Sequence, residues 1–266
     1  MTNPTTPSMT RKVNAERVVL LGWGRAVLLQ FAHPLVAAGV ADHSGFDESL
    51  VDFVRRTHGT IGAMLALTFG TEERARGVAA RINAIHDRVH GTLAEPAGIF
   101  PAGQPYSARD PELLRWVHAT LVDSMLLAWD WFVGPLAPQD KDRYCAEATV
   151  VEPLLGIPRG LLPARVADLH SYIKEVQASG AIVVTETARA LAAGLLSPPL
   201  GIVGRPLVGL MRLTAIGLLP ANIRSAYGFE WDAARERTLH GVATLLRGFR
   251  RFVPRELREW PEVRAA

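Results

Sequence analysis

Residues 81–91 read RINAIHDRVHG, and this stretch decides how the chain is interpreted. Its apolar residues recur with the 3.6-residue period of an amphipathic helix. His86 and His90 are four positions apart, and residues with this spacing share one helix face. We therefore expect a helix over about residues 71–92 with two imidazoles on its inward face. Each imidazole is either a metal ligand or a hydrogen-bonded core residue.

Helical periodicity extends over most of the remaining chain. We expect a buried helix from Asn14 that Pro34 kinks, and a helix beginning near Pro111, a residue suited to a first helical turn. Further helices are expected over residues 47–68, 138–151, 164–195, 200–219, 222–227 and 230–252. The predicted fold class is all-α. Residues 14–266 form a single large helical domain with long buried helices around a cofactor pocket, and residues 1–13 form a disordered N-terminal arm.

Composition excludes several kinds of protein. The chain has 266 residues, 48% of them hydrophobic, which suffices for a large core. The net charge is only +3, and the sequence contains no basic cluster that could follow a phosphate backbone, so we expect no nucleic acid partner. Cys145 is the single cysteine, which excludes an internal disulfide and four-cysteine metal sites. The polar N-terminus lacks the apolar core of a secretory signal, and we expect a cytoplasmic protein.

Two apolar segments approach the length of a membrane span, but both are interrupted. The first, 18–41, contains Arg25 and His33, and the second, 200–219, contains Arg205 and Arg212. We therefore predict no transmembrane segment. Peripheral contact with a membrane surface through the second segment stays open.

The sequence lacks the motifs of several common enzymes, among them G-x-S-x-G, the Walker loop and H-E-x-x-H. Histidine chemistry remains, because six histidines fall within the first 118 residues: His33, His43, His58, His86, His90 and His118. One imidazole in an apolar pocket can bind haem iron and leave the opposite face open to dioxygen. Alternatively, three imidazoles, those of His86, His90 and His118, hold zinc or iron directly.

A series of motifs then points to one family. In order they read GRAVLLQFAHPLVAAGVADHS, VRRT, TFGT, AIHDRVHG, GQPYSARDPELLRWVHATLVDS and LLPANIRSAYGFEW. They resemble a bacterial family of uncharacterised proteins that shares its catalytic domain with the latex-clearing rubber oxygenases. The fungal mycophenolate-pathway oxygenase belongs to the same superfamily. The similarity covers about residues 14–245.

The resemblance implies an all-helical fold, a haem b cofactor and one proximal histidine, which by motif order falls on His86. It also implies oxygen-side residues in an R-x-x-K-T pattern on one helix. Here Thr57 is kept, Arg56 replaces the lysine, and Phe53 replaces the first arginine. Because of this departure, we expect a substrate other than polyisoprene.

The resemblance adds further pocket candidates from the family motifs, namely His43, His90, Tyr106 and His118. Arg25 pairs either with a haem propionate or with an acidic neighbour, and His118 alternatively bonds a neighbouring backbone group. The expected function is a haem b-dependent oxygenase that acts on a small hydrophobic substrate with dioxygen. The alternatives are a non-catalytic binder of haem or an apolar ligand, and a histidine-ligated non-haem metal enzyme. The sequence does not indicate which oligomeric state the protein adopts.

Overall fold

The computed structural model describes residues 8–43 and 50–265, without the side chains of residues 50–54, 56, 264 and 265. This part of the chain is all-α apart from one short two-stranded sheet. The predicted fold class is therefore confirmed.

The first helix begins inside the segment that we expected to be an arm. Helix α1 spans Met9–Ala15, with Ser8 as N-cap, whose side chain accepts a hydrogen bond from the Arg11 N–H. Met9 and Val13 are buried in the main core. The prediction of an unstructured arm up to residue 13 is therefore wrong for residues 9–13, because these two apolar side chains fold back onto the domain.

A sharp bend at Pro34 separates two apolar helices. The 3-10 helix η1 (Arg17–Gly22) leads into α2 (Trp23–Phe31), and α3 (Pro34–His43) follows at 103° to them. Proline removes one helical hydrogen bond and its ring clashes with the preceding turn, so the predicted break is confirmed. Among the described residues no single helix is long and apolar enough to cross a membrane. The two segments on either side of the bend at Pro34 reach the required length and apolar character only when they are counted together.

Helix α4 (Leu50–Phe69) packs against α5 (Glu72–His86), which Thr71 caps as expected. However, α5 ends at His86, and His90 lies in strand β1 (His90–Thr92). This strand pairs antiparallel with β2 (Pro105–Ser107), with Gly91 opposite Tyr106. The expectation that His86 and His90 share one helix face is therefore wrong.

Helix α6 (Pro111–Phe132) is the central element. Asp110 caps it and Pro111 occupies its first turn, as the sequence predicts. It packs against η1, α2 and the later helices α9 and α13, and it contributes Trp116 and Phe132, two of the largest fully buried side chains. Burial of this apolar surface supplies most of the driving force for folding.

The rest of the chain forms shorter helices around α6. They are α7 (Pro138–Ala148), the 3-10 helix η2 (Thr149–Val151), α8 (Glu152–Leu155), α9 (Val166–Ala178), α10 (Glu186–Leu196), α11 (Gly201–Gly217), α12 (Ala221–Ala226), α13 (Ala233–Arg250), α14 (Arg255–Arg258) and α15 (Glu262–Ala265). The single helix predicted over 164–195 is wrong. Gly180 adopts a φ of +82°, which ends α9, and the Thr185 side chain caps a new helix.

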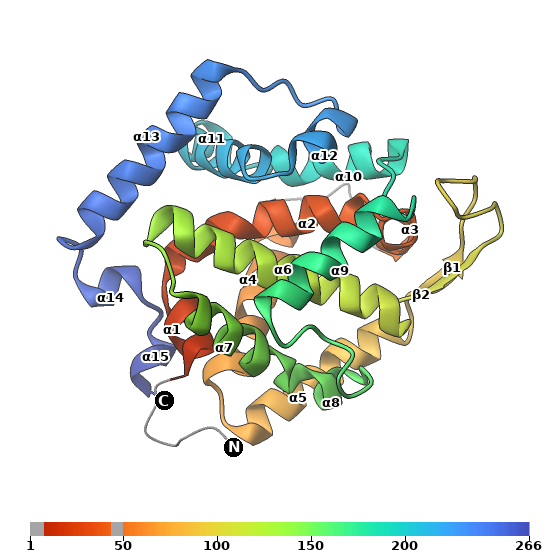
Figure 1. Ribbon diagram of the computed structural model, residues 1–266, viewed down its shortest axis with the longest axis horizontal. Helices are drawn as coiled ribbons and strands as arrows, with labels where there is room; N and C mark the ends of the chain where they lie inside the picture. The colour runs from red at the N-terminus through yellow and green to blue at the C-terminus, as the bar shows by residue number, and fades with distance from the viewer. Residues whose placement is uncertain (1–7, 44–49, 266) are drawn as a thin grey trace.

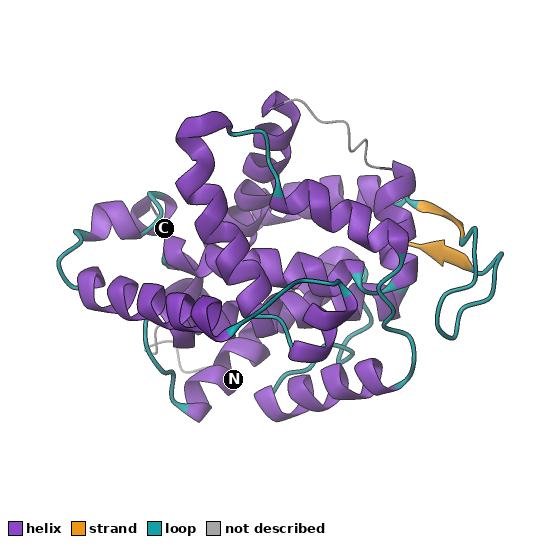
Figure 2. Ribbon diagram, turned by 90° about the horizontal axis from the view of Figure 1, so that it is seen from above, coloured by secondary structure: helices purple, strands orange, loops and turns teal. Residues whose placement is uncertain are grey.

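The helices form layers with α2 and α6 in the middle. In Figure 1, α10, α11 and α12 lie above them, and α5, α7 and α8 lie below. The hairpin of β1 and β2 projects at one end of the molecule in Figure 1 and again in Figure 2. The end of α5, the start of α6 and the end of α3 meet near the base of this hairpin, and this junction forms the candidate site.

Candidate functional site

A cavity of about 290 Å³ lies between α3, the end of α5, strand β2 and the first turns of α6. Its walls are mainly apolar, and they include Leu35, Val36, Val40, Val89 and Val117. The polar side chains at the wall are those of Gln30, His43, His86, Tyr106 and Ser107. Because Ile85 and His43 are exposed, the cavity reaches the protein surface beside them. A few polar groups in an apolar hollow are typical of a small-molecule site.

His86 is the residue of this cavity that is best suited to bind a metal. It is the last residue of α5, and its Nδ1 atom is buried without a hydrogen-bond partner. Burial lowers the pKa of His86 below 6.5, and the nearby charge of Arg109 lowers it further, against a smaller opposing effect of Asp87. The imidazole is therefore neutral at pH 7, which is the form that binds metals.

A second set of residues holds the turn that carries His86. Arg109 donates from Nη1 to Asn83 Oδ1 at 2.6 Å, and its Nε lies 3.1 Å from Asp87 Oδ1. Asn83 in turn donates from Nδ2 to the carbonyl oxygen of Leu154 at 2.9 Å. Asn83 and Asp87 flank His86 in sequence, so these contacts tie the end of α5 to α8 and to the segment before α6.

The hairpin side of the cavity is closed by Tyr106, whose ring is buried. Its hydroxyl donates a short hydrogen bond to Asp42 Oδ2. Burial raises the pKa of Tyr106, and the bond to Asp42 raises it further, so the hydroxyl keeps its proton. The ring of His43 lies edge-on to that of Tyr106, with centroids 6.5 Å apart, and His43 Nε2 is 3.1 Å from the carbonyl oxygen of His90.

Gly39 forms the part of the wall where α3 approaches this tyrosine. A Cβ atom placed there would lie 3.3 Å from Val89 Cγ1 and 3.5 Å from Tyr106 Cε2. The absence of a side chain at this position therefore keeps space open within the cavity.

Several predicted site residues lie elsewhere. His90 is exposed on β1, and His118 Nε2 bonds the carbonyl oxygen of Ala148 at 3.2 Å, the backbone alternative named above. Arg25 is buried, with Nη2 2.7 Å from Asp123 Oδ2, which is the acidic-neighbour alternative. It also donates to the Leu218 carbonyl oxygen and to Ser124 Oγ.

The predicted oxygen-side residues both lie on α4. The side chain of Thr57 is exposed, and that of Arg56 lies outside the described residues, as does that of Phe53. Thr57 is not among the residues that line the cavity. The described residues also bring together no group of three histidine, cysteine or acidic side chains that would hold a metal ion.

The structure thus gathers His43, His86 and Tyr106 around one cavity. It adds five residues that the sequence did not single out as site residues: Gln30, Gly39, Asp42, Asn83 and Arg109. Gln30 donates from Nε2 to the Val117 carbonyl oxygen at 3.2 Å, which links α2 to α6 at the cavity wall. Asp42 was detectable in principle, because it directly precedes His43 at the end of a helix.

Fold and site together define an all-helical protein with an apolar, histidine-bearing cavity. The chain belongs to the family described as ER-bound oxygenase mpaB/B'/Rubber oxygenase, catalytic domain, whose model matches residues 10–252. The predicted family is therefore confirmed, and membership supports an oxygenase-type function.

Relatives of similar length match this chain over most of their sequence. Two uncharacterised proteins, one from Mycobacterium bovis and one from Mycobacterium tuberculosis, are each 27% identical over 233 residues. The matched region covers 86% of this chain and 87% of each relative. No solved structure matches the chain significantly.

Proposed function

We propose that this protein is a haem b-dependent oxygenase in which His86 is the proximal ligand and the cavity beside it admits a small hydrophobic substrate. The observation that carries the proposal is the neutral imidazole of His86, with an unpartnered ring nitrogen, at the wall of an apolar cavity. Family membership supports the same reaction class.

The residues present fit a haem in their chemistry. Haem iron is commonly held by one neutral histidine, and its ring system prefers apolar surroundings. Bound haem would supply the redox chemistry by which dioxygen is activated. The volume of about 290 Å³ is just below the range of about 300–1,000 Å³ for ligand cavities, so we expect the walls to move apart on binding.

This chain's own residues would do three things. His86 would hold the cofactor, and Arg109 with Asn83 would keep the His86 turn in place. The apolar side chains of α3, α5 and α6 would exclude water and bind an apolar substrate. Only the family resemblance assigns Arg56 and Thr57 to the oxygen side. Both lie on α4, which packs against α5, but Thr57 does not line the cavity.

Two measurements on the purified, haem-reconstituted protein test the proposal. Iron and porphyrin analysis should give one haem per chain, and oxygen uptake should rise with at least one member of a panel of terpenoids, fatty acids and polyketides. Haem binding without oxygen uptake on any of them would contradict the oxygenase part. Stoichiometric zinc or iron without porphyrin would contradict the cofactor.

A further inference from the structure

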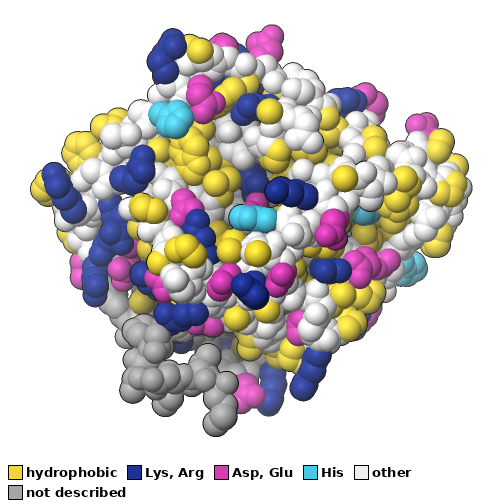
Figure 3. All heavy atoms as spheres, in the orientation of Figure 1, with side chains coloured by type: hydrophobic (Ala, Val, Ile, Leu, Met, Phe, Trp, Pro, Cys, Tyr) yellow, Lys and Arg dark blue, Asp and Glu magenta, His cyan; other side chains and the backbone are white. Residues whose placement is uncertain are grey.

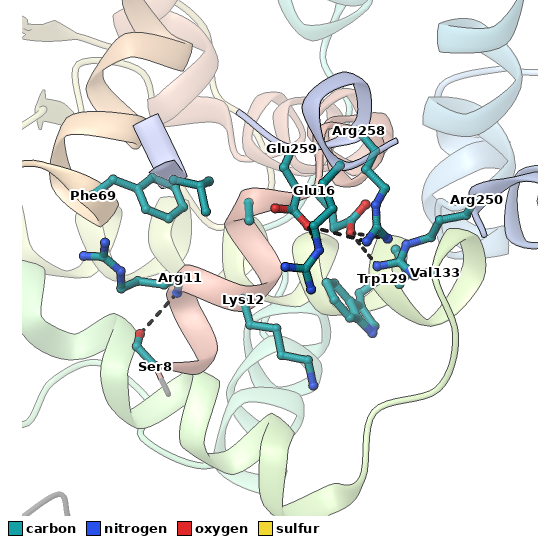
Figure 4. Close-up of a pocket in the computed structure, with 13 residues that line it drawn as sticks. Ser8, Arg11, Lys12, Glu16, Phe69, Trp129, Val133, Arg250, Arg258 and Glu259 are labelled. Atoms are coloured by element: carbon teal, nitrogen blue, oxygen red, sulfur yellow. Dashed lines mark hydrogen bonds and ion pairs between the residues drawn. The ribbon is translucent and has the colours of Figure 1, made fainter. Parts of the chain in front are cut away.

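A second hollow, of about 550 Å³, lies at the C-terminal end of α6, whereas the cavity beside His86 lies at its N-terminal end. The two share no lining residue. Its walls come from α1, the end of α4, the last turns of α6 and the C-terminal helices α13 to α15. Figure 4 shows residues from these elements facing one another around it.

The lining of this hollow has an excess of positive charge. Five of its side chains are cationic, namely Arg11, Lys12, Arg250, Arg255 and Arg258, and two are carboxylates, Glu16 and Glu259. Figure 3 shows dark blue side chains gathered along the edge of the molecule formed by α13 and α14. The excess is local, since the whole chain has a net charge of only +3.

Both carboxylates have cationic partners, and Glu259 Oε1 lies 3.7 Å from Arg255 Nε and 3.6 Å from Arg258 Nη2. Glu16, with a side chain only 3% exposed, accepts from both Arg250 and Arg258 at Oε1, the latter at 3.1 Å. The Nε donors of both arginines and Glu16 Oε2 are buried without partners. Glu16 therefore has two cations around it, and the cluster retains buried donors without acceptors.

Arg11 and Lys12 are cations without a carboxylate partner within the described part of the chain. The guanidinium of Arg11 lies 5.2 Å from the ring centre of Phe69, and Lys12 Nζ lies 5.8 Å from that of Trp129. In Figure 4, Trp129 lies between Lys12 and Arg250. Trp129 thus lies between Lys12 and the Glu16 cluster, whereas Arg11 lies against Phe69.

We propose that this hollow binds an amphipathic organic anion, a carboxylate or phosphate attached to an apolar body. The anionic group is attracted to the α1 wall, where Arg11 and Lys12 lack carboxylate partners within the described part of the chain. Their side chains point apart in Figure 4, so one of them contacts the anion and the other adds to the positive potential. A charge-assisted hydrogen bond to the contacting cation is roughly twice as strong as a neutral one. The apolar body lies on Val133 and Val263, which line the hollow and are partly exposed, whereas Phe69 and Trp129 are only 5% and 6% exposed. This site is separate from the proposed catalytic cavity and does not depend on haem.

Decanoate and decan-1-ol, which differ in charge but not in chain length, test the headgroup. Calorimetry on the full chain should show decanoate binding at least tenfold more tightly than the alcohol. The double variant Arg11→Gln/Lys12→Gln should lose at least tenfold in decanoate affinity. The matched control Arg159→Gln/Lys174→Gln removes two exposed cations elsewhere and should bind as the unmodified chain does.

The source of the anion is resolved by a second arm with vesicles of phosphatidylcholine containing phosphatidylglycerol. Co-sedimentation that R11Q/K12Q abolishes would assign the headgroup to a bilayer lipid, and decanoate binding without co-sedimentation would assign a dissolved acid. Equal affinity for decanoate and decanol, or an unchanged affinity in a folded R11Q/K12Q variant, would overturn the proposal. So would binding of neither probe.

Discussion

Arg109 donates a hydrogen bond to Asn83 across 2.6 Å, and this contact anchors the helical turn that presents His86. The same guanidinium lies 3.1 Å from Asp87. The two partners are on either side of His86, so one arginine restrains both the start and the end of the turn. Arg109 therefore helps to set the orientation of the His86 side chain, although Arg109 itself does not line the cavity.

Arg109→Ala should loosen this turn. The loss of hydrogen bonds to a charged donor should cost about 1–3 kcal/mol of stability. Removal of the positive charge should also raise the pKa of His86 toward 6.5, because the imidazolium is no longer repelled. Chemical denaturation measures the first effect, and an NMR pH titration measures the second. Arg76→Ala, which breaks an exposed pair on the same helix, should change neither. An unaltered His86 pKa in R109A would contradict this positioning role.

Gly39→Val should obstruct the cavity beside His86. The new side chain would meet Val89 and Tyr106, since a Cβ alone already approaches them to 3.3 and 3.5 Å. We expect haem uptake, measured by spectroscopic titration, to fall at least tenfold. Gly62→Val on α4 provides a control, because nothing lies within 4 Å of a Cβ there. Equal uptake by the two variants would show that the ligand does not occupy this cavity.

Asp123→Ala should destabilise the core without altering the site. Burial raises the pKa of Asp123, but a hydrogen bond from His170 and the charge of Arg25 outweigh it, so the carboxylate is ionised. Its removal leaves Arg25 as an unpaired buried cation, at a cost of about 3–5 kcal/mol. Denaturation should show this loss, and the spectrum of the folded, haem-loaded variant should match that of the unmodified protein.

Glu186→Ala removes one partner of an exposed ion pair and should cost under about 1 kcal/mol. If D123A were no more destabilising than E186A, the Arg25–Asp123 pair would not be the structural contact described here. A changed haem spectrum in D123A would instead place Arg25 near the cofactor.

Acidification should destabilise the protein through His33, which is buried, and His118, which is partly buried. Burial lowers the pKa values of His33 and His118 to about 4, whereas unfolding returns them to about 6.5. Between these values the unfolded chain binds more protons, so the free energy of unfolding falls as the pH falls. Each histidine should cost about 1.5 kcal/mol between pH 6.5 and pH 5. Urea denaturation of His33→Asn across this range should show a smaller loss than the unmodified chain. An identical pH dependence would contradict a neutral, buried His33.

The sequence predicted the fold class and most helices because the signals for these are local. The N-cap and proline at the start of α6 and the break at Pro34 are examples. Local periodicity was misleading after His86, where the apolar pattern continues to Val89 but the chain turns into β1. That change of direction depends on pairing with β2, thirteen or more residues later, which no short window contains.

Only part of the site was predicted, again because the sequence reveals local signals and not contacts between distant segments. Histidines and Tyr106 were found because their side-chain chemistry is evident from residue type and family motifs. The partners Asn83 and Arg109 were not found, since each acts through a contact with a distant segment. Asp42 was overlooked although it directly precedes His43. Arg25 remained ambiguous in sequence because its carboxylate partner, Asp123, lies on a different helix.

The most direct test of the account is the absorption spectrum of haem-reconstituted His86→Gly, recorded with and without added imidazole. We predict that the variant loses the Soret band of the unmodified protein and that free imidazole, by occupying the vacated space, restores it. His43→Gly, which alters another part of the same cavity wall, should retain the band without rescue. A His86→Gly variant with the full spectrum in the absence of imidazole would contradict the central claim.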